Sequence, residues 1–175
     1  MPRPSNRDRV LDAYETLLVD GGGAAVTLDA VASAAGVSKG GLLYHFPSKE
    51  ALVEGVGERL RVFVEADVQA LLAAPEGAVA YWLTSSAEDA QGPLTRTYQA
   101  ALRLAGAGLT PARAALADAD RAWTAALEHR IPDPVLARLV RLVGDGLYLE
   151  GLAGLSGRPD TAPLQALLEQ LLRDR

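Results

Sequence analysis

The stretch TLDAVASAAGVSKGGLLYHFPSKEAL, residues 27–52, decides the fold. It contains two short helical patterns that are separated by Gly36, and a longer pattern begins at Ser48. Thr27, Ser38 and Ser48 each stand where a side-chain hydroxyl can accept a hydrogen bond from a free N–H group in the first turn of a helix. The stretch therefore predicts a compact module of short helices that are joined by tight turns.

Apolar residues outside this stretch recur with the 3.6-residue period of helices, and no segment alternates as a strand and hairpin would. Glycine and proline clusters divide the chain into helix-length pieces. We therefore expect an all-α fold. The predicted helices lie near residues 6–19, 27–35, 38–46, 48–74, 77–89, 93–106, 111–130, 133–155 and 161–173.

The chain has 175 residues, enough for one large domain or two small ones, and no cysteine, which leaves no disulfide or thiolate metal site. Its net charge of −5 argues against a broad nucleic-acid-binding surface. The window from Ala30 to Lys49 differs, because it has no acidic residue but contains Lys39, His45 and Lys49. If the protein binds an anion, we expect it to bind there.

Two adjacent glycines, Gly40 and Gly41, stand in the first turn of the second short helix. Each costs a helix interior about 0.5–1 kcal/mol relative to alanine. Two short helices with a tight turn outline a helix-turn-helix module, whose second helix enters the major groove of DNA. A first turn that lies against base edges gains from having no Cβ atom. Lys39 can reach guanine or phosphate from there, and Tyr44 and His45 offer donors to phosphate one turn later.

These residues resemble the DNA-binding domain of the tetracycline-repressor-like (TetR) family, in which GVSKG, a small residue, Leu-Tyr-x-His-Phe, a short turn and Lys-Glu-x-Leu follow one another. The resemblance is firm over about residues 6–60. The family usually has tyrosine where this chain has Leu43, so either Tyr44 supplies that phosphate contact or the affinity for DNA is lower. The resemblance implies DNA contacts from Lys39, Gly40, Gly41, Tyr44 and His45, and phosphate contacts from Thr27, Ser38 and Lys49.

Beyond residue 60 the resemblance is architectural, since the second domain of this family usually holds an effector pocket and a dimer interface. The helix near residues 133–155 is apolar on most faces, which indicates that it is buried on more than one side. The helix near residues 161–173 carries a leucine stripe on one face. Gly144, Gly151 and Gly154 would permit close approach of a second subunit, although packing within one subunit is the alternative. The expected interface residues are Val140, Val143, Leu147, Gly151, Leu164, Leu168 and Leu171.

Aromatic residues are candidates to line an effector cavity between the long helix and its neighbours, although such residues are also typical of an ordinary core. No basic cluster suggests an acidic ligand, and aromatic residues are only 5% of the chain, so we expect an apolar small molecule. The candidates are Phe63, Tyr81, Trp82, Tyr98, Trp123 and Tyr148.

The sequence is thus interpreted as a DNA-binding transcriptional regulator, a repressor that responds to a ligand and binds a palindromic operator in double-stranded DNA as a homodimer. We expect a DNA-binding domain over residues 1–47, with the motif at 27–46. An effector-binding and dimerisation domain would follow over residues 48–175, joined through the helix at 48–74. The alternative is a helical adaptor that binds proteins instead of DNA.

An enzyme fits the sequence less well, because His45 and His129 are the only imidazoles and no phosphate-binding glycine loop or metal-ligand spacing occurs. We expect no catalytic residue, cofactor or metal. No apolar run reaches the roughly 18 residues of a membrane span, and the N-terminal MPRPSNRDR lacks the apolar region of a signal peptide. These features predict a cytoplasmic protein with no membrane partner.

Overall fold

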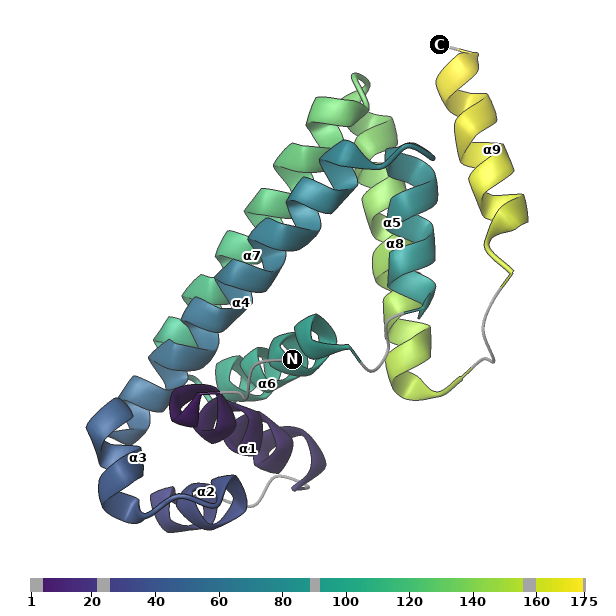
Figure 1. Cartoon of the computed structure of the whole chain (residues 1–175). Helices are drawn as coiled ribbons and strands as arrows, with labels where there is room; N and C mark the ends of the chain where they lie inside the picture. The colour runs from purple at the N-terminus through teal and green to yellow at the C-terminus, as the bar shows by residue number, and fades with distance from the viewer. Residues whose placement is uncertain (1–4, 22–25, 89–91, 156–159, 175) are drawn as a thin grey trace. The chain divides into compact units, whose positions relative to one another are not determined.

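The computed structural model describes residues 5–21, 26–88, 92–155 and 160–174, and these residues form helices and no strand (Figure 1). The predicted all-α class is therefore confirmed. The observed helix ends lie within two residues of the predicted ones. The helices are α1 (Asn6–Asp20), α2 (Leu28–Ala35), α3 (Lys39–His45), α4 (Lys49–Ala73), α5 (Ala78–Glu88), α6 (Pro93–Gly106), α7 (Thr110–Arg130), α8 (Pro134–Ala153) and α9 (Ala162–Arg173).

The turn between α2 and α3 is fixed by local chemistry. Gly36 has a φ of 63°, the left-handed conformation that glycine adopts without steric cost. Arg9 of α1 crosses to this turn, where its Nη2 donates to the carbonyl oxygens of Ala35 at 2.6 Å and Gly36 at 3.3 Å. Two carbonyls at the end of α2 are thus satisfied by a long-range partner.

The chain divides into two compact units. The first comprises the described residues up to Phe63 together with Pro93–Ala119, and it contains α1, α2, α3, the beginning of α4, α6 and the beginning of α7. Within it, α1 packs against α2, α3 and α6. Its core is made of fully buried apolar side chains, which include Val10, Leu11, Tyr14, Val31, Leu42, Leu52, Val56, Leu60 and Ala101.

This first unit extends past the expected domain boundary at residue 47. The reason is that α1 is buried on two faces, one covered by α2 and the other by α6. The sequence pattern of α6 does not reveal which helix it will cover, so its place beside α1 could not be predicted from periodicity.

The second unit comprises Val64–Gly92 and Asp120–Arg175, and it contains the end of α4, α5, the end of α7, α8 and α9. Here α5 packs along α8, and α9 contacts both. The core of this unit includes the buried side chains of Leu71, Trp82, Leu83, Leu127, Val140 and Leu147. Among the described residues, no helix is both long and apolar enough to cross a membrane.

Candidate nucleic-acid interface and effector-domain cluster

Helix α3 is attached to the first unit by one face and presents the other to solvent. Leu42 is fully buried and Phe46 is 2% exposed. Arg7 of α1 lies over the Phe46 ring, with its guanidinium carbon 5.3 Å from the ring centre. In contrast, Tyr44 is 85% exposed and Leu43 is 36% exposed. The tyrosine hydroxyl is therefore placed outside the core, next to the leucine that stands where the family pattern has tyrosine.

The two glycines of α3 are not required by the backbone, and only Gly41 is confined by internal packing. Neither has a positive φ. A Cβ atom on Gly40 would meet no atom within 4 Å, whereas one on Gly41 would lie 3.3 Å from the Oγ of Ser38, the residue that caps the helix. Gly40 therefore faces open space, which is the arrangement expected where the surface receives a molecule from outside.

Lys39 has a partner that the sequence did not indicate. Its Nζ lies 2.9 Å from Oδ1 and 3.2 Å from Oδ2 of Asp29, in the first turn of α2. The two side chains are 59% and 71% exposed, so the pair contributes only roughly 0–1 kcal/mol. Asp29 adjoins the acid-free window, and its approach to Lys39 depends on how α2 and α3 cross. A DNA phosphate or base that binds Lys39 has to compete with this carboxylate.

The other predicted DNA ligands lie on exposed or half-buried positions of the first unit. The hydroxyls of Thr27 and Ser38 accept hydrogen bonds from backbone N–H groups three residues later, at 3.2 and 3.1 Å. Since each hydroxyl accepts there, its O–H remains a donor that suits a phosphate oxygen. The Tyr44 and His45 rings meet edge to face at 5.0 Å, and Lys49 is exposed at the start of α4.

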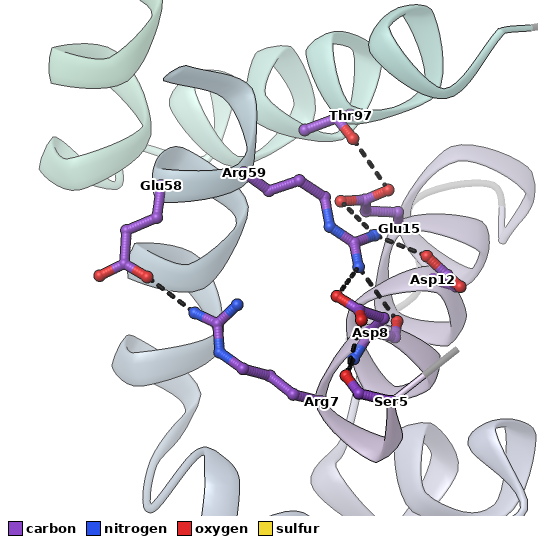
Figure 2. Close-up of polar contacts among 8 residues, drawn as sticks. All are labelled: Ser5, Arg7, Asp8, Asp12, Glu15, Glu58, Arg59 and Thr97. Carbon is purple, nitrogen blue, oxygen red and sulfur yellow. Dashed lines mark hydrogen bonds and ion pairs between the residues drawn. The ribbon is translucent and has the colours of Figure 1, made fainter. Parts of the chain in front are cut away.

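A polar cluster joins α1 to α4 and α6 (Figure 2). Arg59 of α4 donates from Nη1 to Asp12 at 2.6 Å and to Glu15 at 3.4 Å. Its Nη2 donates to the carbonyl oxygen of Asp8 at 3.1 Å and to the Asp8 carboxylate at 3.3 Å. Thr97 of α6 donates to the second oxygen of Glu15 at 3.0 Å. One guanidinium and one buried carboxylate thus connect three helices of the first unit.

Burial controls the ionisation of this cluster. Glu15 is 2% exposed, and its burial raises its pKa to about 7, although Arg59 and the hydrogen bond from Thr97 act in the opposite direction. The pKa of Asp8 is lowered instead, first by the hydrogen bond from the Ser5 hydroxyl at 2.6 Å and then by Arg59. Glu15 therefore changes charge near neutral pH, while Asp8 stays ionised.

Three of the six aromatic residues that were predicted to line a pocket meet in the second unit. The rings of Trp82 and Trp123 are 5.9 Å apart and inclined by 63°. Asp67 of α4 accepts hydrogen bonds from the Tyr81 hydroxyl and from Trp123 Nε1, each at 2.7 Å. The guanidinium carbon of Arg141 lies 5.0 Å from the Trp82 ring centre and 5.3 Å from that of Trp123. A charge of the chain itself occupies this aromatic pair.

The remaining three pocket candidates are placed differently. Phe63 and Tyr98 belong to the first unit, where both are half-buried, and Tyr148 is half-buried on α8 in the second. Trp82 and Trp123 were proposed from the sequence because they are aromatic, and Arg141 was missed because an arginine in an apolar helix pattern is expected to be solvated.

The residues predicted to form a dimer interface divide between the interior and the surface of the single chain. Val140, Leu147 and Leu168 are buried, Val143 and Gly151 are half-buried, and Leu164 and Leu171 are exposed. Gly144 serves contact within the chain, because a Cβ atom there would overlap Trp82 and Ser86 of α5. The exposed apolar side chains of α8 and α9, called here the α8–α9 apolar surface, are Val135, Leu139, Leu142, Leu149, Leu164, Leu167 and Leu171.

Two family models match consecutive parts of the chain, and their boundary differs from that between the two compact units, because residues 93–119 of the first unit belong to the second match. Residues 10–56 match the family described as bacterial regulatory proteins, tetR family, and residues 57–173 match the tetracyclin repressor-like C-terminal domain. None of the curated proteins matches this sequence.

Solved structures resemble the whole chain. A TetR family member, SCO1917 from Streptomyces coelicolor A3, is 25% identical with a TM-score of 0.71, covering 96% of this chain and 98% of its own. The multidrug binding protein EbrR, complexed with imidazole, is 25% identical with a TM-score of 0.64, covering 97% and 96%. NalD, the secondary repressor of the MexAB-OprM multidrug efflux pump in Pseudomonas aeruginosa, shares the fold at 20% identity, with a TM-score of 0.68 and coverage of 96% and 95%.

The two family models together span nearly the entire chain, and the helix-turn-helix geometry described above lies inside the first of them. The chain therefore belongs to the TetR family of DNA-binding transcriptional regulators.

Proposed function

We propose that this regulator is a repressor that binds a palindromic operator in double-stranded DNA as a homodimer and responds to a small-molecule ligand. The observation that carries the DNA-binding part is the free face of α3. Gly40 faces open space, Tyr44 is almost fully exposed, and Lys39 is held only by an exposed carboxylate. Such a face suits close approach to base edges and phosphates.

The α8–α9 apolar surface supports a dimer. Leu167 is 55% exposed, Leu142 50% and Leu149 64%, and apolar side chains of this size gather on the two helices. Exposed apolar side chains that are numerous on neighbouring helices are typical of a protein interface. Two-fold symmetry would place two recognition helices on successive major grooves, about 34–36 Å apart, which is why a palindromic operator is proposed.

The ligand response is proposed from the second unit. EbrR, which shares 25% identity over nearly the whole chain, is a multidrug binding protein. Asp67 of α4 bonds the aromatic cluster, and the same helix contributes Arg59 to the polar cluster of the first unit. If the protein binds the ligand more tightly with α4 in one position than in another, the ligand favours that position of α4. The spacing between the two recognition helices of the dimer would then change.

Selection of DNA fragments by the purified full-length protein tests the operator, and titration at several salt concentrations tests the charge contacts. We expect affinity to fall steeply as salt rises. Lys39→Ala should weaken binding. It should also reduce the slope of the logarithm of affinity against the logarithm of salt concentration by about one, the value for one phosphate contact. Asp29→Asn should strengthen binding, because Lys39 then has no internal competitor.

Arg138→Ala is the matched control, since it removes one exposed positive charge from α8 in the second unit. It should leave operator affinity unchanged. An adaptor would select no DNA sequence, and wild-type affinity in Lys39→Ala would remove this residue from the interface.

A further inference from the structure

The aromatic pair of the second unit is a cation site that is already filled. Trp82 of α5 is 5% exposed, Trp123 of α7 is 7% exposed, and Arg141 of α8 is 5% exposed. The guanidinium carbon lies 5.0 and 5.3 Å from the two ring centres. A positive charge within about 6 Å of an aromatic face is attracted by the ring quadrupole. The two tryptophans are thus arranged to hold a flat cation.

Three carboxylates lie beside this pair or beside the guanidinium that it holds. Asp145 accepts from Arg141 Nε with both oxygens, at 2.9 and 3.1 Å. Asp120 lies 3.4 Å from Arg141 Nη2, and Asp67 accepts from Trp123 Nε1 at 2.7 Å. In the part of the chain that the structure describes, three carboxylates thus contact Arg141 or Trp123. Their field favours positive charge and disfavours a negatively charged ligand.

Arg141 can leave the pair without losing its ion pair. Asp145 lies one turn further along α8, and its side chain is 46% exposed. An arginine on a flexible stem can turn outward beside such an i+4 carboxylate and remain paired at the helix surface. Trp82 is less free to move, because its Nε1 donates to the Arg141 carbonyl at 3.4 Å and its ring occupies the space left by Gly144.

We propose that Trp82, Trp123 and the three carboxylates form the effector site for a planar organic cation, which binds by displacing the guanidinium of Arg141. This inference rests on the proposed ligand response of the second unit. An amidinium or a charged nitrogen heterocycle can make the same ring contacts as the guanidinium and carries the same positive charge. A neutral aromatic molecule would keep the ring contacts but lose the attraction between a positive charge and the two rings, which the guanidinium provides before it is displaced. The effector is then a cation and differs from the apolar molecule that composition led us to expect.

Tryptophan fluorescence of the full-length protein can test this directly. The chain has two tryptophans, and both lie in the proposed site. Benzamidinium, benzamide and benzoate are planar probes of nearly equal size that carry positive, zero and negative charge. In the absence of DNA, we expect benzamidinium to change the emission saturably, with an affinity at least about tenfold higher than that of the other two. Equal responses to the three probes, or none to benzamidinium, would overturn the proposal.

Arg141→Ala tests the displacement step. Without the internal competitor, this variant should bind benzamidinium about tenfold more tightly than the wild type and keep its preference over benzamide. Arg138→Ala, on the exposed side of the same helix, should bind benzamidinium like the wild type. Unchanged or weaker binding by folded Arg141→Ala would show that the guanidinium does not occupy the ligand's place.

If Arg141→Ala does not fold, the three probes on the wild-type protein still decide the ligand charge, and Arg141→Lys tests displacement. A compact ammonium stacks less well on the rings than a guanidinium, so this variant should also bind benzamidinium more tightly. None of these measurements contains DNA. Selective benzamidinium binding by a protein that selects no operator would support the cation site and contradict the proposed repressor function. Operator selection by a protein that does not bind benzamidinium selectively would contradict only the cation site.

Discussion

At the scale of single residues, a side chain at Gly40 should have opposite effects on folding stability and on the proposed DNA contact. Its Cβ position is open, so Gly40→Ala should raise the free energy of unfolding by about 0.5–1 kcal/mol through helix propensity. The same methyl group would stand where the groove approaches, so operator affinity should fall. Chemical denaturation and DNA titration measure the two effects.

Gly106→Ala is a suitable control for Gly40→Ala, because Gly106 is exposed at the end of α6 and its Cβ position is also open. This variant should leave DNA affinity unchanged. If Gly40→Ala gains stability and binds the operator like the wild type, the glycine has no role in groove approach.

Tyr14 is a second residue at which the fold tolerates a local cost. The side chain is fully buried, and its hydroxyl has no hydrogen-bond partner among the described residues. Burial raises the pKa of Tyr14 to about 12, so it stays neutral and its hydroxyl is a lone buried polar group. Removing such a group should stabilise the protein, and we expect Tyr14→Phe to raise the free energy of unfolding by about 1 kcal/mol.

Tyr81→Phe provides the contrasting variant for Tyr14→Phe. The Tyr81 hydroxyl donates to Asp67 at 2.7 Å, so its removal leaves a carboxylate oxygen without that donor. This substitution should lower the free energy of unfolding in the same urea titration. Loss of stability in both variants would mean that Tyr14 has a partner in solution.

At the scale of helices, Glu15 makes the junction of α1, α4 and α6 sensitive to pH. Its pKa is about 7 in the folded protein against an ordinary glutamate value of 4.5. Between these pH values the folded state retains a proton that the unfolded state has lost. Stability therefore falls as pH rises through this range, by as much as roughly 3 kcal/mol.

Urea titrations of the wild type from pH 4.5 to 8 measure this slope. Glu15→Gln should remove the decrease, because glutamine keeps the hydrogen-bonding shape and does not titrate. Asp12→Asn changes an exposed carboxylate that contacts the same Arg59. It should leave most of the decrease in place, because burial raises the pKa of Glu15 more than the charge of Asp12 does. A wild-type slope that persists in Glu15→Gln would assign the titration to another group.

The helix ends were predictable and the contacts between helices were not. Gly36, Ser38 and the turn at Asp133 act on backbone groups a few residues away, so the sequence alone located them. The pair of Lys39 with Asp29 spans ten residues and that of Arg59 with Glu15 spans 44. Such pairs depend on how helices cross, which periodicity does not specify. The sequence therefore predicted candidate residues of the DNA-binding face and of the aromatic cluster, but it did not predict the carboxylates that lie next to them.

At the scale of the whole molecule, the α8–α9 apolar surface predicts a dimer. Leu167→Glu places a charge on an exposed position of α9 and should shift the protein from dimer to monomer in sedimentation at micromolar concentration. Leu102→Glu is the matched control, because Leu102 is 42% exposed on α6 in the first unit. It should remain a dimer.

A wild-type protein that sediments as a folded monomer would contradict the dimer. A Leu167→Glu protein that stays dimeric would place the interface elsewhere than on α9. Either result would also weaken the argument for a palindromic operator, since that argument depends on two-fold symmetry.

The pair between Lys39 and Asp29 has a consequence for how the protein finds its site in a genome. Non-specific binding to DNA depends on unpaired positive charge. This chain has a net charge of −5, and Lys39, a lysine proposed to contact DNA, is paired with an exposed carboxylate. The protein should therefore bind unrelated DNA weakly, stay on it only briefly and slide along it little. We expect the search to proceed by short, repeated collisions from solution, so that promoter occupancy follows the number of copies in the cell.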